Sequence, residues 1–215
     1  MVQSVPLWEQ PLLRLAAGDT LRPGGFTITD RAADFVGLAP GWPVLDVGSG
    51  LGATVERLRA RYGAMAHGVE PSWTQLKRGR GTGQVQAWGD DLPFLSSSFR
   101  ALFCECVLSL FPDAEQGLAE FNRVLQPGAF LLLSDLCGHG DPAGGTSCAV
   151  RALPRAQTEA IVEAAGFRLL LVEDHSRLLH QLAARLLFAG GEEQACNCGQ
   201  PQLGYYLLVG QKKEE

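Results

Sequence analysis

The fold of this chain is decided by one stretch of sequence, VLDVGSGLGAT at residues 44–54. The apolar run from Val44 to Val47 ends in glycines, and a helical pattern follows from Ala53 to Arg61, which is the order strand, turn, helix. Glycines in such a turn let the backbone approach a ligand, and the start of the helix offers free N–H groups to an anionic group. The stretch therefore predicts a nucleotide-binding turn.

Outward from this turn, short apolar runs alternate with helical patterns. Strands are predicted at 65–69, 84–88, 101–108, 130–136, 167–173 and 204–210, and helices from about Thr29 and at 73–78, 114–125, 154–165 and 176–188. Strands separated by helices indicate an α/β protein with a parallel sheet covered on both faces. The last strand follows a strand, a helix and a long loop, an order that allows it to insert antiparallel to the others.

Length, composition and charge narrow the class of protein. A chain of 215 residues is enough for one sizeable core, and no linker or repeat divides it, so one domain is expected. No apolar run reaches the roughly 18 residues of a membrane span, and the first 20 residues do not read as a secretory signal. The net charge of −5 gives no electrostatic footprint for nucleic acid. We expect a cytoplasmic protein that engages neither membranes nor nucleic acids.

The glycine turn alone leaves two cofactor classes open. Gly48, Gly50 and Ala53 also satisfy the G-x-G-x-x-A dinucleotide fingerprint, so a nicotinamide or flavin site is an alternative. Asp46 stands inside the strand, where a purely structural role would favour an apolar residue. Glu70 ends the next strand and is placed to accept hydrogen bonds from two ribose hydroxyls, which either cofactor offers.

A third acidic feature is GDDLPF at residues 89–94, after the third predicted strand. An acidic side chain there, Asp90 or Asp91, can meet an adenine amino group, and Leu92 or Phe94 can line the face of the ring. The three acidic features together shift the balance between the two cofactor classes.

At this point the chain resembles the class I S-adenosylmethionine-dependent methyltransferases, particularly the small-molecule branch with ubiquinone, menaquinone and arsenite methyltransferases. The resemblance covers roughly residues 40–136. It rests on VLDVGSGLGAT, on GVEPS at 68–72, on GDDLPF, and on FPDAEQGLAEFNRVLQPGAFLLLSDL at 111–136. The last segment is the most specific, because an acid-rich helix followed by RVL, Pro-Gly and an apolar strand is not expected of a dehydrogenase. The resemblance favours S-adenosylmethionine over a nicotinamide.

The resemblance implies a doubly wound, mostly parallel seven-stranded sheet with an antiparallel last strand, and methyl transfer to a small molecule. It divides the single domain into an N-terminal arm and helix (1–38), a cofactor-binding core (40–136) and a substrate-side region (137–215). Arg100 and Ala129 depart from the family pattern, which usually has Asp and Gly at these positions.

Carried over residue by residue, the resemblance places the methionine moiety beside Asp46, the ribose on Glu70 and the sulfonium above Cys104. The N-terminal arm often lids the cofactor in this family, and Arg22 can pair with the methionine carboxylate or an anionic substrate. The predicted cofactor-binding residues are Arg22, Asp46, Gly48, Ser49, Gly50, Gly52, Glu70, Pro71, Asp90, Asp91, Leu92 and Cys104.

The sequence indicates the catalytic residues less clearly than the cofactor-binding residues. Methyl transfer needs the acceptor fixed near the methyl carbon, and a base only if the acceptor carries a proton. Glu105 and His139 are the candidate catalytic residues, with Asp135 and Asp141 as further acids after strand ends. Glu105 can equally bind a cofactor hydroxyl or a water, and His139 can be a plain loop histidine.

The six cysteines lack a secretory context, so reduced thiols are expected. Cys196 and Cys198, with Cys137, His139 or Cys148, could form a thiolate site for arsenite or zinc, but inert thiols are favoured and no metal is expected. Cys104 and Cys106 are two apart on a predicted strand and should share a face.

Two questions stay open at the level of sequence. A non-catalytic S-adenosylmethionine-binding module is the first alternative to an enzyme, and a nicotinamide oxidoreductase is the second. The chain is expected to be a monomer or a homodimer, and the leucine-rich helix at 176–188 suits either core packing or a dimer face.

Overall fold

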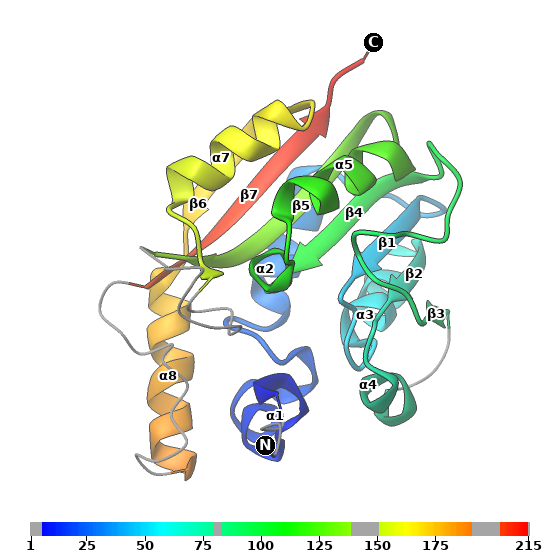
Figure 1. Ribbon diagram of the computed structural model, residues 1–215. Helices are drawn as coiled ribbons and strands as arrows, with labels where there is room; N and C mark the ends of the chain where they lie inside the picture. The colour runs from blue at the N-terminus through cyan, green and yellow to red at the C-terminus, as the bar shows by residue number, and fades with distance from the viewer. Residues whose placement is uncertain (1–5, 80–82, 139–150, 191–202, 215) are drawn as a thin grey trace.

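The protein folds around a seven-stranded sheet with helices on both faces (Figure 1). The computed structural model describes residues 6–79, 83–138, 151–190 and 203–214. The strands are β1 (Pro43–Val47), β2 (Met65–Val69), β3 (Gln84–Val85), β4 (Phe99–Glu105), β5 (Leu125–Cys137), β6 (Phe167–Asp174) and β7 (Gly204–Lys212). The helices are α1 (Pro11–Ala17), α2 (Phe26–Phe35), α3 (Ala53–Tyr62), α4 (Trp73–Arg78), α5 (Ala114–Val124), α7 (Arg155–Ala164) and α8 (Ser176–Gly190), with short 3-10 turns η1 (Leu7–Glu9), η2 (Gly18–Thr20) and η3 (Leu108–Leu110).

The strand order across the sheet is β3-β2-β1-β4-β5-β7-β6. Strands β3, β2, β1, β4 and β5 are parallel, and β7 is antiparallel to both β5 and β6. From β1 the order runs outward in two directions, and ligands of such sheets bind where that reversal occurs, outside the carboxyl ends of the strands. The predicted doubly wound, mostly parallel sheet with an antiparallel last strand is confirmed.

Each face of the sheet buries its own apolar layer. On one face, α2, α3 and α8 contribute side chains such as Ile28, Leu58 and Leu179. On the other face, α5 and α7 contribute Phe121 and Val162. Because both faces are covered, the central strands are apolar almost throughout. The buried polar side chains of β1, β4 and β5 lie toward the carboxyl ends of these strands: Asp46, Glu105, Ser134 and Asp135.

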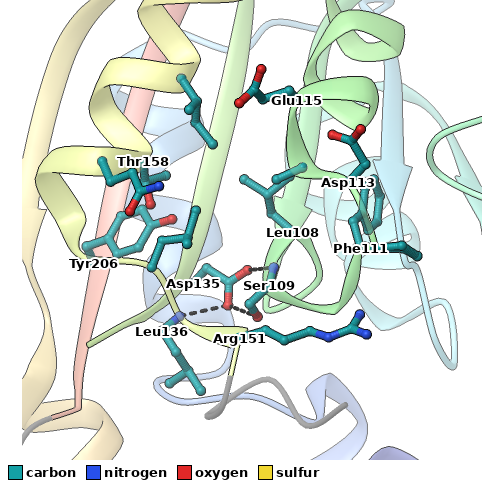
Figure 2. A pocket seen from close by; sticks show the side chains of 15 residues that line it. Leu108, Ser109, Phe111, Asp113, Glu115, Asp135, Leu136, Arg151, Thr158 and Tyr206 are labelled. Atoms are coloured by element: carbon teal, nitrogen blue, oxygen red, sulfur yellow. Dashed lines mark hydrogen bonds between the residues drawn. The ribbon is translucent and has the colours of Figure 1, made fainter. Parts of the chain in front are cut away.

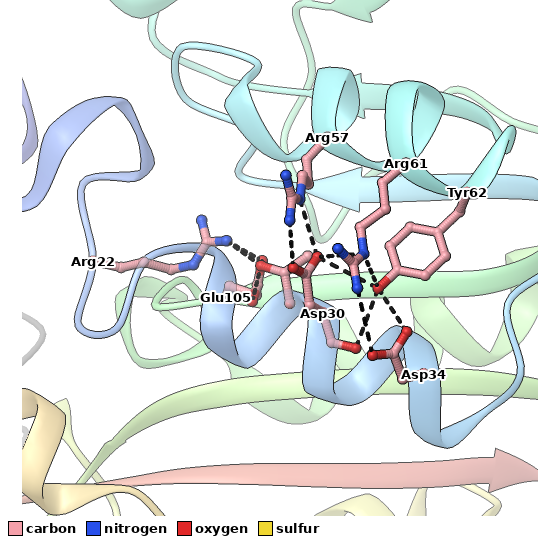
Figure 3. A network of polar contacts seen from close by, with 8 residues as sticks. Arg22, Asp30, Asp34, Arg57, Arg61, Tyr62 and Glu105 are labelled. Atoms are coloured by element: carbon pink, nitrogen blue, oxygen red, sulfur yellow. Dashed lines mark hydrogen bonds and ion pairs between the residues drawn. The ribbon is translucent and has the colours of Figure 1, made fainter.

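The N-terminal segment reaches across this edge of the sheet. Helix α1 packs against α8 through Leu13, Leu182 and Leu186, and Figure 1 shows the two helices beyond the carboxyl ends of the central strands. Helix α2 is held to α3 by an ion pair of 2.6 Å between Asp30 and Arg57 (Figure 3). The chain between α1 and α2 is thereby fixed over the end of β4.

The end of β4 differs from the prediction. The sequence predicts a strand over 101–108, but β4 stops at Glu105 because Cys106 adopts a φ of 59°. The turned residue packs toward the α2, α3 and α8 face, while Cys104 packs on the α5 and α7 face. The expectation that the two thiols share a face is therefore wrong. A backbone hydrogen bond of 2.7 Å from Cys106 N to Ser134 O holds the turned conformation.

Two other strands differ from their predicted bounds by more than two residues at one end. Strand β3 is limited to two residues instead of 84–88, and β5 begins at Leu125 instead of 130. Of the helices in the described ranges, none is long and apolar enough to cross a membrane.

Candidate active site

The carboxyl ends of β1, β2 and β4 bring the predicted acids together. Strand β1 pairs with β2 on one side and with β4 on the other, and all three run in the same direction. Asp46, Glu70 and Glu105 each stand at or just beyond the end of one of these strands, and each is at least nine-tenths buried. Three buried carboxyl groups at one edge of a sheet require compensating charge or hydrogen bonds.

The glycine turn closes tightly against its surroundings. Gly48 has a φ of 71°, and a Cβ on it would lie 2.3 Å from a methyl carbon of Val107. Gln84 donates hydrogen bonds from Nε2 to Ser49 Oγ (2.8 Å) and to Gly50 O (3.1 Å). Val107 and Gln84 therefore hold the glycine turn from two sides.

Glu70 is tied to the same turn. Its Oε2 accepts a hydrogen bond from Gly50 N (2.9 Å) and its Oε1 accepts one from Ser72 N (2.8 Å). Burial raises the pKa of Glu70, and the two backbone donors partly oppose that shift. A carboxylate has about four lone-pair sites, so each oxygen keeps acceptor capacity for a ligand hydroxyl.

Asp46 is the least satisfied of the three acids. It is 3% exposed, and no hydrogen bond from another described residue reaches its carboxyl. Burial raises the pKa of Asp46 well above its ordinary value, Glu105 adds to the shift, Arg22 opposes it and Glu70 adds a smaller increase. A buried carboxyl without donors is a site for a cationic ligand group.

Arg22 and Glu105 form a buried ion pair beside Asp46 (Figure 3). The guanidinium Nη2 lies 2.6 Å from Glu105 Oε2, with side chains 7% and 4% exposed. Arg22 also donates to the hydroxyls of Thr29 (2.5 Å) and Thr54 (3.0 Å). Its Nε is buried without a hydrogen-bond partner among the described residues. The pair joins the N-terminal segment to the end of β4 and leaves one donor free.

Comparisons with known proteins show that the chain is similar to methyltransferases. A methyltransferase domain family matches residues 45–133. Methyltransferase GfsG of Streptomyces halstedii is 26% identical to the chain over 240 residues, covering 95% of this chain and 85% of GfsG. The matched region contains the glycine turn, Glu70 and the end of β4.

The chain is similar to S-adenosylmethionine-dependent methyltransferases, and its residues 45–133 match a methyltransferase domain.

Solved structures show the same methyltransferase fold. The [4+2]-cyclase SpnF superposes with a TM-score of 0.74 at 21% identity, covering 87% of this chain and 81% of SpnF. Phosphoethanolamine N-methyltransferase 2 of Haemonchus contortus, in complex with S-adenosyl-L-methionine, has a TM-score of 0.76 at 18% identity and covers 94% of this chain and 56% of its own. The prediction of a methyltransferase that uses S-adenosylmethionine is confirmed, and the nicotinamide alternative is set aside.

The side chains of the methyltransferase crevice fit this cofactor. Within the described part of the chain, Asp46 has no hydrogen-bond donor and suits the ammonium group, and Arg22 Nε has no acceptor and suits the carboxylate. Glu70 keeps acceptor capacity for the ribose hydroxyls. Ser49, Gly50 and Gly52 belong to the glycine turn.

The residues predicted to lie near the adenine differ in their burial. Asp90 is half-buried and Asp91 is exposed. The Leu92 side chain is 4% exposed and packs in the core, so it presents no open face to a ring. Its backbone is clamped by α5, because Leu92 N donates to Glu120 (3.0 Å) and Leu92 O accepts from Arg123 (3.0 Å). Pro71, half-buried, directly follows Glu70.

The remaining predicted residues are placed as follows. Cys104 is fully buried, and burial raises the pKa of its thiol well above the ordinary value, as expected of a packing residue. Asp135 is saturated by donors from Ser109 and Leu136. His139, Asp141, Cys148, Cys196 and Cys198 lie outside the described residues. Within the described ranges, no group of three or more His, Cys, Asp or Glu side chains could hold a metal.

Sequence reasoning missed three residues of this site: Gln84, Thr29 and Thr54. Each is a polar side chain that turns inward from a different element, and Thr29 and Thr54 are fully or nearly fully buried. A threonine on the apolar face of a helical pattern is the available signal, because a buried hydroxyl needs a partner. Gln84 carries no such signal, since its strand is only two residues long.

Asp46→Asn should stabilise the ligand-free methyltransferase while weakening cofactor binding. The folded-state pKa of Asp46 is raised, so the folded protein binds more protons, and wild-type stability falls as pH rises from about 4 through that pKa. The uncharged amide removes this cost, which we expect to add about 1 to 3 kcal/mol at pH 8 and little at pH 4. Urea unfolding at several pH values measures the difference. Glu163→Gln, at an exposed position of α7, is the control. If Asp46→Asn is no more stable than the wild-type protein at pH 8, the Asp46 carboxyl is not the buried, uncompensated charge described here.

Glu70→Ala should weaken binding of S-adenosylhomocysteine by about 1 to 3 kcal/mol, or roughly 5- to 150-fold, the range for losing hydrogen bonds to a charged acceptor. Isothermal titration calorimetry measures the affinity. Unchanged affinity, with the variant folded by circular dichroism, removes Glu70 from the site.

Proposed function

We propose that this methyltransferase transfers the methyl group of S-adenosylmethionine to a small organic molecule at the carboxyl end of β4. The observation that carries the proposal is the buried carboxyl of Asp46, which accepts no hydrogen bond from the described residues and lies beside a glycine turn tied to Glu70. The relatives support a small acceptor, since they include a sterol methyltransferase-like protein of Botryococcus braunii and a demethylmenaquinone methyltransferase of Corynebacterium urealyticum.

The chain's own residues divide the work of holding the cofactor. When bound, S-adenosylmethionine supplies an electrophilic methyl group on a positively charged sulfur. Asp46 holds the ammonium group, Arg22 the carboxylate and Glu70 the ribose, while Asp90 or Asp91 meets the adenine amino group. Gly48, Gly50 and Gly52 let the backbone lie against the ligand, with Ser49 and Pro71 in the same walls.

The Arg22–Glu105 pair closes the crevice from the N-terminal side. Both side chains are buried, so this closure excludes water from the end of β4. Excluding water strengthens every electrostatic interaction inside the site and prevents hydrolysis. The pair therefore orients the donor and protects it.

Glu105 and His139 are the proposed catalytic residues. Burial raises the pKa of Glu105, and its contacts with Arg22, Thr29 and Thr54, which stabilise the ionised form, oppose that shift without cancelling it. A carboxylate held by a guanidinium and two hydroxyls gives up those contacts when it takes a proton. The site thus favours acceptors that are easily ionised, such as phenols, quinols or thiols, which need little assistance from a base.

A non-catalytic or non-methylating role is the second candidate. The Arg22–Glu105 ion pair is buried at the end of β4, and the [4+2]-cyclase SpnF has the same fold. Location in the cytoplasm, the three-part division of one domain, and a monomer or homodimer stay predictions.

Release of S-adenosylhomocysteine tests the proposal directly. Purified protein is incubated with S-adenosylmethionine and a panel of phenols, quinols, thiols and arsenite. We expect acceptor-dependent release with at least one phenol or quinol, and loss of about tenfold or more of that activity in Asp46→Asn, because the donor is held less tightly. Glu163→Gln serves as the control. Tight binding of the cofactor with no release on any acceptor would favour the non-catalytic role.

A further inference from the structure

The N-terminal segment contacts the carboxyl edge of the sheet at a second place, where the η1 turn lies on α4. Glu9 Oε1 accepts a hydrogen bond of 2.6 Å from Ser72 Oγ, and Glu9 O accepts one of 3.1 Å from Arg78 Nη1. The side-chain amide of Gln75 donates to Trp8 O. Three hydrogen bonds therefore hold η1 on the helix that follows β2.

Ser72 connects this contact to the ribose acid of the cofactor site. Its backbone N donates to Glu70 Oε1 (2.8 Å). Its Oγ accepts from Gln75 N (3.2 Å) at the start of α4 and donates to Glu9. Burial is the main cause of the raised pKa of Glu70, and the Glu9 carboxylate adds to the shift, so the two acids are close enough to interact. Glu9 and Glu70 are thus joined through one residue.

Leu21, near the other end of the segment, lies over the glycine turn. Cβ atoms on Gly48 and Gly52 would lie 2.3 and 2.8 Å from neighbouring side chains, whereas the nearest atom to a Cβ on Gly50 is Leu21 Cδ1, at 3.8 Å. Leu21 has a φ of 55°, in the left-handed region that is uncommon for a leucine. A ligand that lies against this side of Gly50 must displace Leu21.

The N-terminal segment therefore crosses the whole cofactor crevice. It contacts the ribose side through Glu9, the glycine turn through Leu21 and the end of β4 through Arg22. Between these points α1 packs on α8, and Figure 1 shows α1 between α4 and α8. Because the segment covers the open side of the glycine turn, we expect the cofactor to enter and leave only when one end of the segment moves.

The η1 end of the segment opens at the smaller cost. Arg22 is buried in its ion pair with Glu105 and leads directly into α2, which packs in the core. Glu9 and Ser72 are half-buried, so water can replace their hydrogen bond when it breaks. Regions with few buried apolar contacts and exposed hydrogen bonds open with the lowest free energy.

We propose that Glu9 and Ser72 are positioning residues for the cofactor, and that their hydrogen bond, which holds the N-terminal segment on α4, sets the rate at which the cofactor leaves the crevice. The inference rests on the proposed function, in which Glu70 holds the ribose. While the hydrogen bond is formed, Ser72 fixes Glu70 and the segment covers the ligand. When it breaks, η1 leaves α4 and the crevice opens at its ribose side.

Dissociation of labelled S-adenosylhomocysteine from the full chain, chased with excess unlabelled ligand, tests the proposal. Glu9→Ala removes the acceptor of the Ser72 hydroxyl and should increase the dissociation rate about 3- to 10-fold, the effect of losing one partly exposed hydrogen bond. Glu9→Gln removes the charge but keeps an acceptor oxygen, so its rate should stay within about twofold of wild type. A wild-type rate in Glu9→Ala, or the same increase in both variants, overturns the proposal.

A double-mutant cycle tests whether the two residues act as a pair. Ser72→Ala should increase the dissociation rate at least as much as Glu9→Ala, because it also removes the N-terminal cap of α4. Adding Glu9→Ala to Ser72→Ala should have little further effect, since both changes break the same hydrogen bond. Additive increases in the dissociation rate overturn the proposal.

Asp113→Ala is the matched control for loss of a helix cap. Asp113 caps α5 by accepting from Gln116 N (3.0 Å), as Ser72 caps α4. It borders a cavity of about 350 Å³ on the α5 and α7 face of the sheet, away from the N-terminal segment (Figure 2). Asp113→Ala should release S-adenosylhomocysteine at the wild-type rate. An increase equal to that of Ser72→Ala would show a general effect of destabilisation and overturn the proposal.

The same measurements separate this inference from the proposed function. If the wild-type chain binds S-adenosylhomocysteine and Glu9→Ala releases it at the same rate, the role of Glu9 and Ser72 is wrong and the proposed function stands. If the wild-type chain does not bind S-adenosylhomocysteine, the proposed function is contradicted and this inference with it.

Discussion

The charge balance at the carboxyl ends of β1 and β4 is the constraint on which the rest of the site depends. Asp46 and Glu105 are both buried there, and Arg22 is the cation that faces them. With both acids ionised, the three groups carry an excess negative charge in a region of low dielectric, which is costly without a cationic partner. A ligand with an ammonium group supplies that partner, and a sulfonium adds further positive charge, so we expect the site to favour a ligand that brings a cationic group to Asp46.

This constraint explains why the N-terminal segment is part of the site. Arg22 comes from the chain between α1 and α2, and its guanidinium reaches Glu105 and the hydroxyls of Thr29 and Thr54. The position of α2 is in turn fixed on α3 by Asp30 and Arg57. The packing of α2 on α3, on one face of the sheet, is thereby coupled to the charge balance at the carboxyl ends of the strands. The cavity between α5 and α7 lies on the other face.

The sequence predicted the elements well and the contacts between them less well. β1, β2, α3 and α4 follow from local patterns, and the acids at 46 and 70 follow from strand ends, because both signals are local. The partner of Arg22 is 83 residues away, and the hydroxyls that surround the pair come from two helices, so no local pattern contains them. The end of β4 was mispredicted because Cys106 adopts a left-handed backbone conformation that its residue type does not announce. Leu92 was expected beside the adenine, but the clamp from Glu120 and Arg123 turns its side chain into the core.

A crystal structure of the chain with S-adenosylhomocysteine is the most direct test of the cofactor site assigned to Asp46 and Glu70. We expect the amino nitrogen of the ligand within about 3 Å of the Asp46 carboxyl, a hydrogen-bonding distance, and the ribose hydroxyls at Glu70. A crevice that the Arg22–Glu105 pair still fills, with the ligand absent or bound with its amino group away from Asp46, would contradict it.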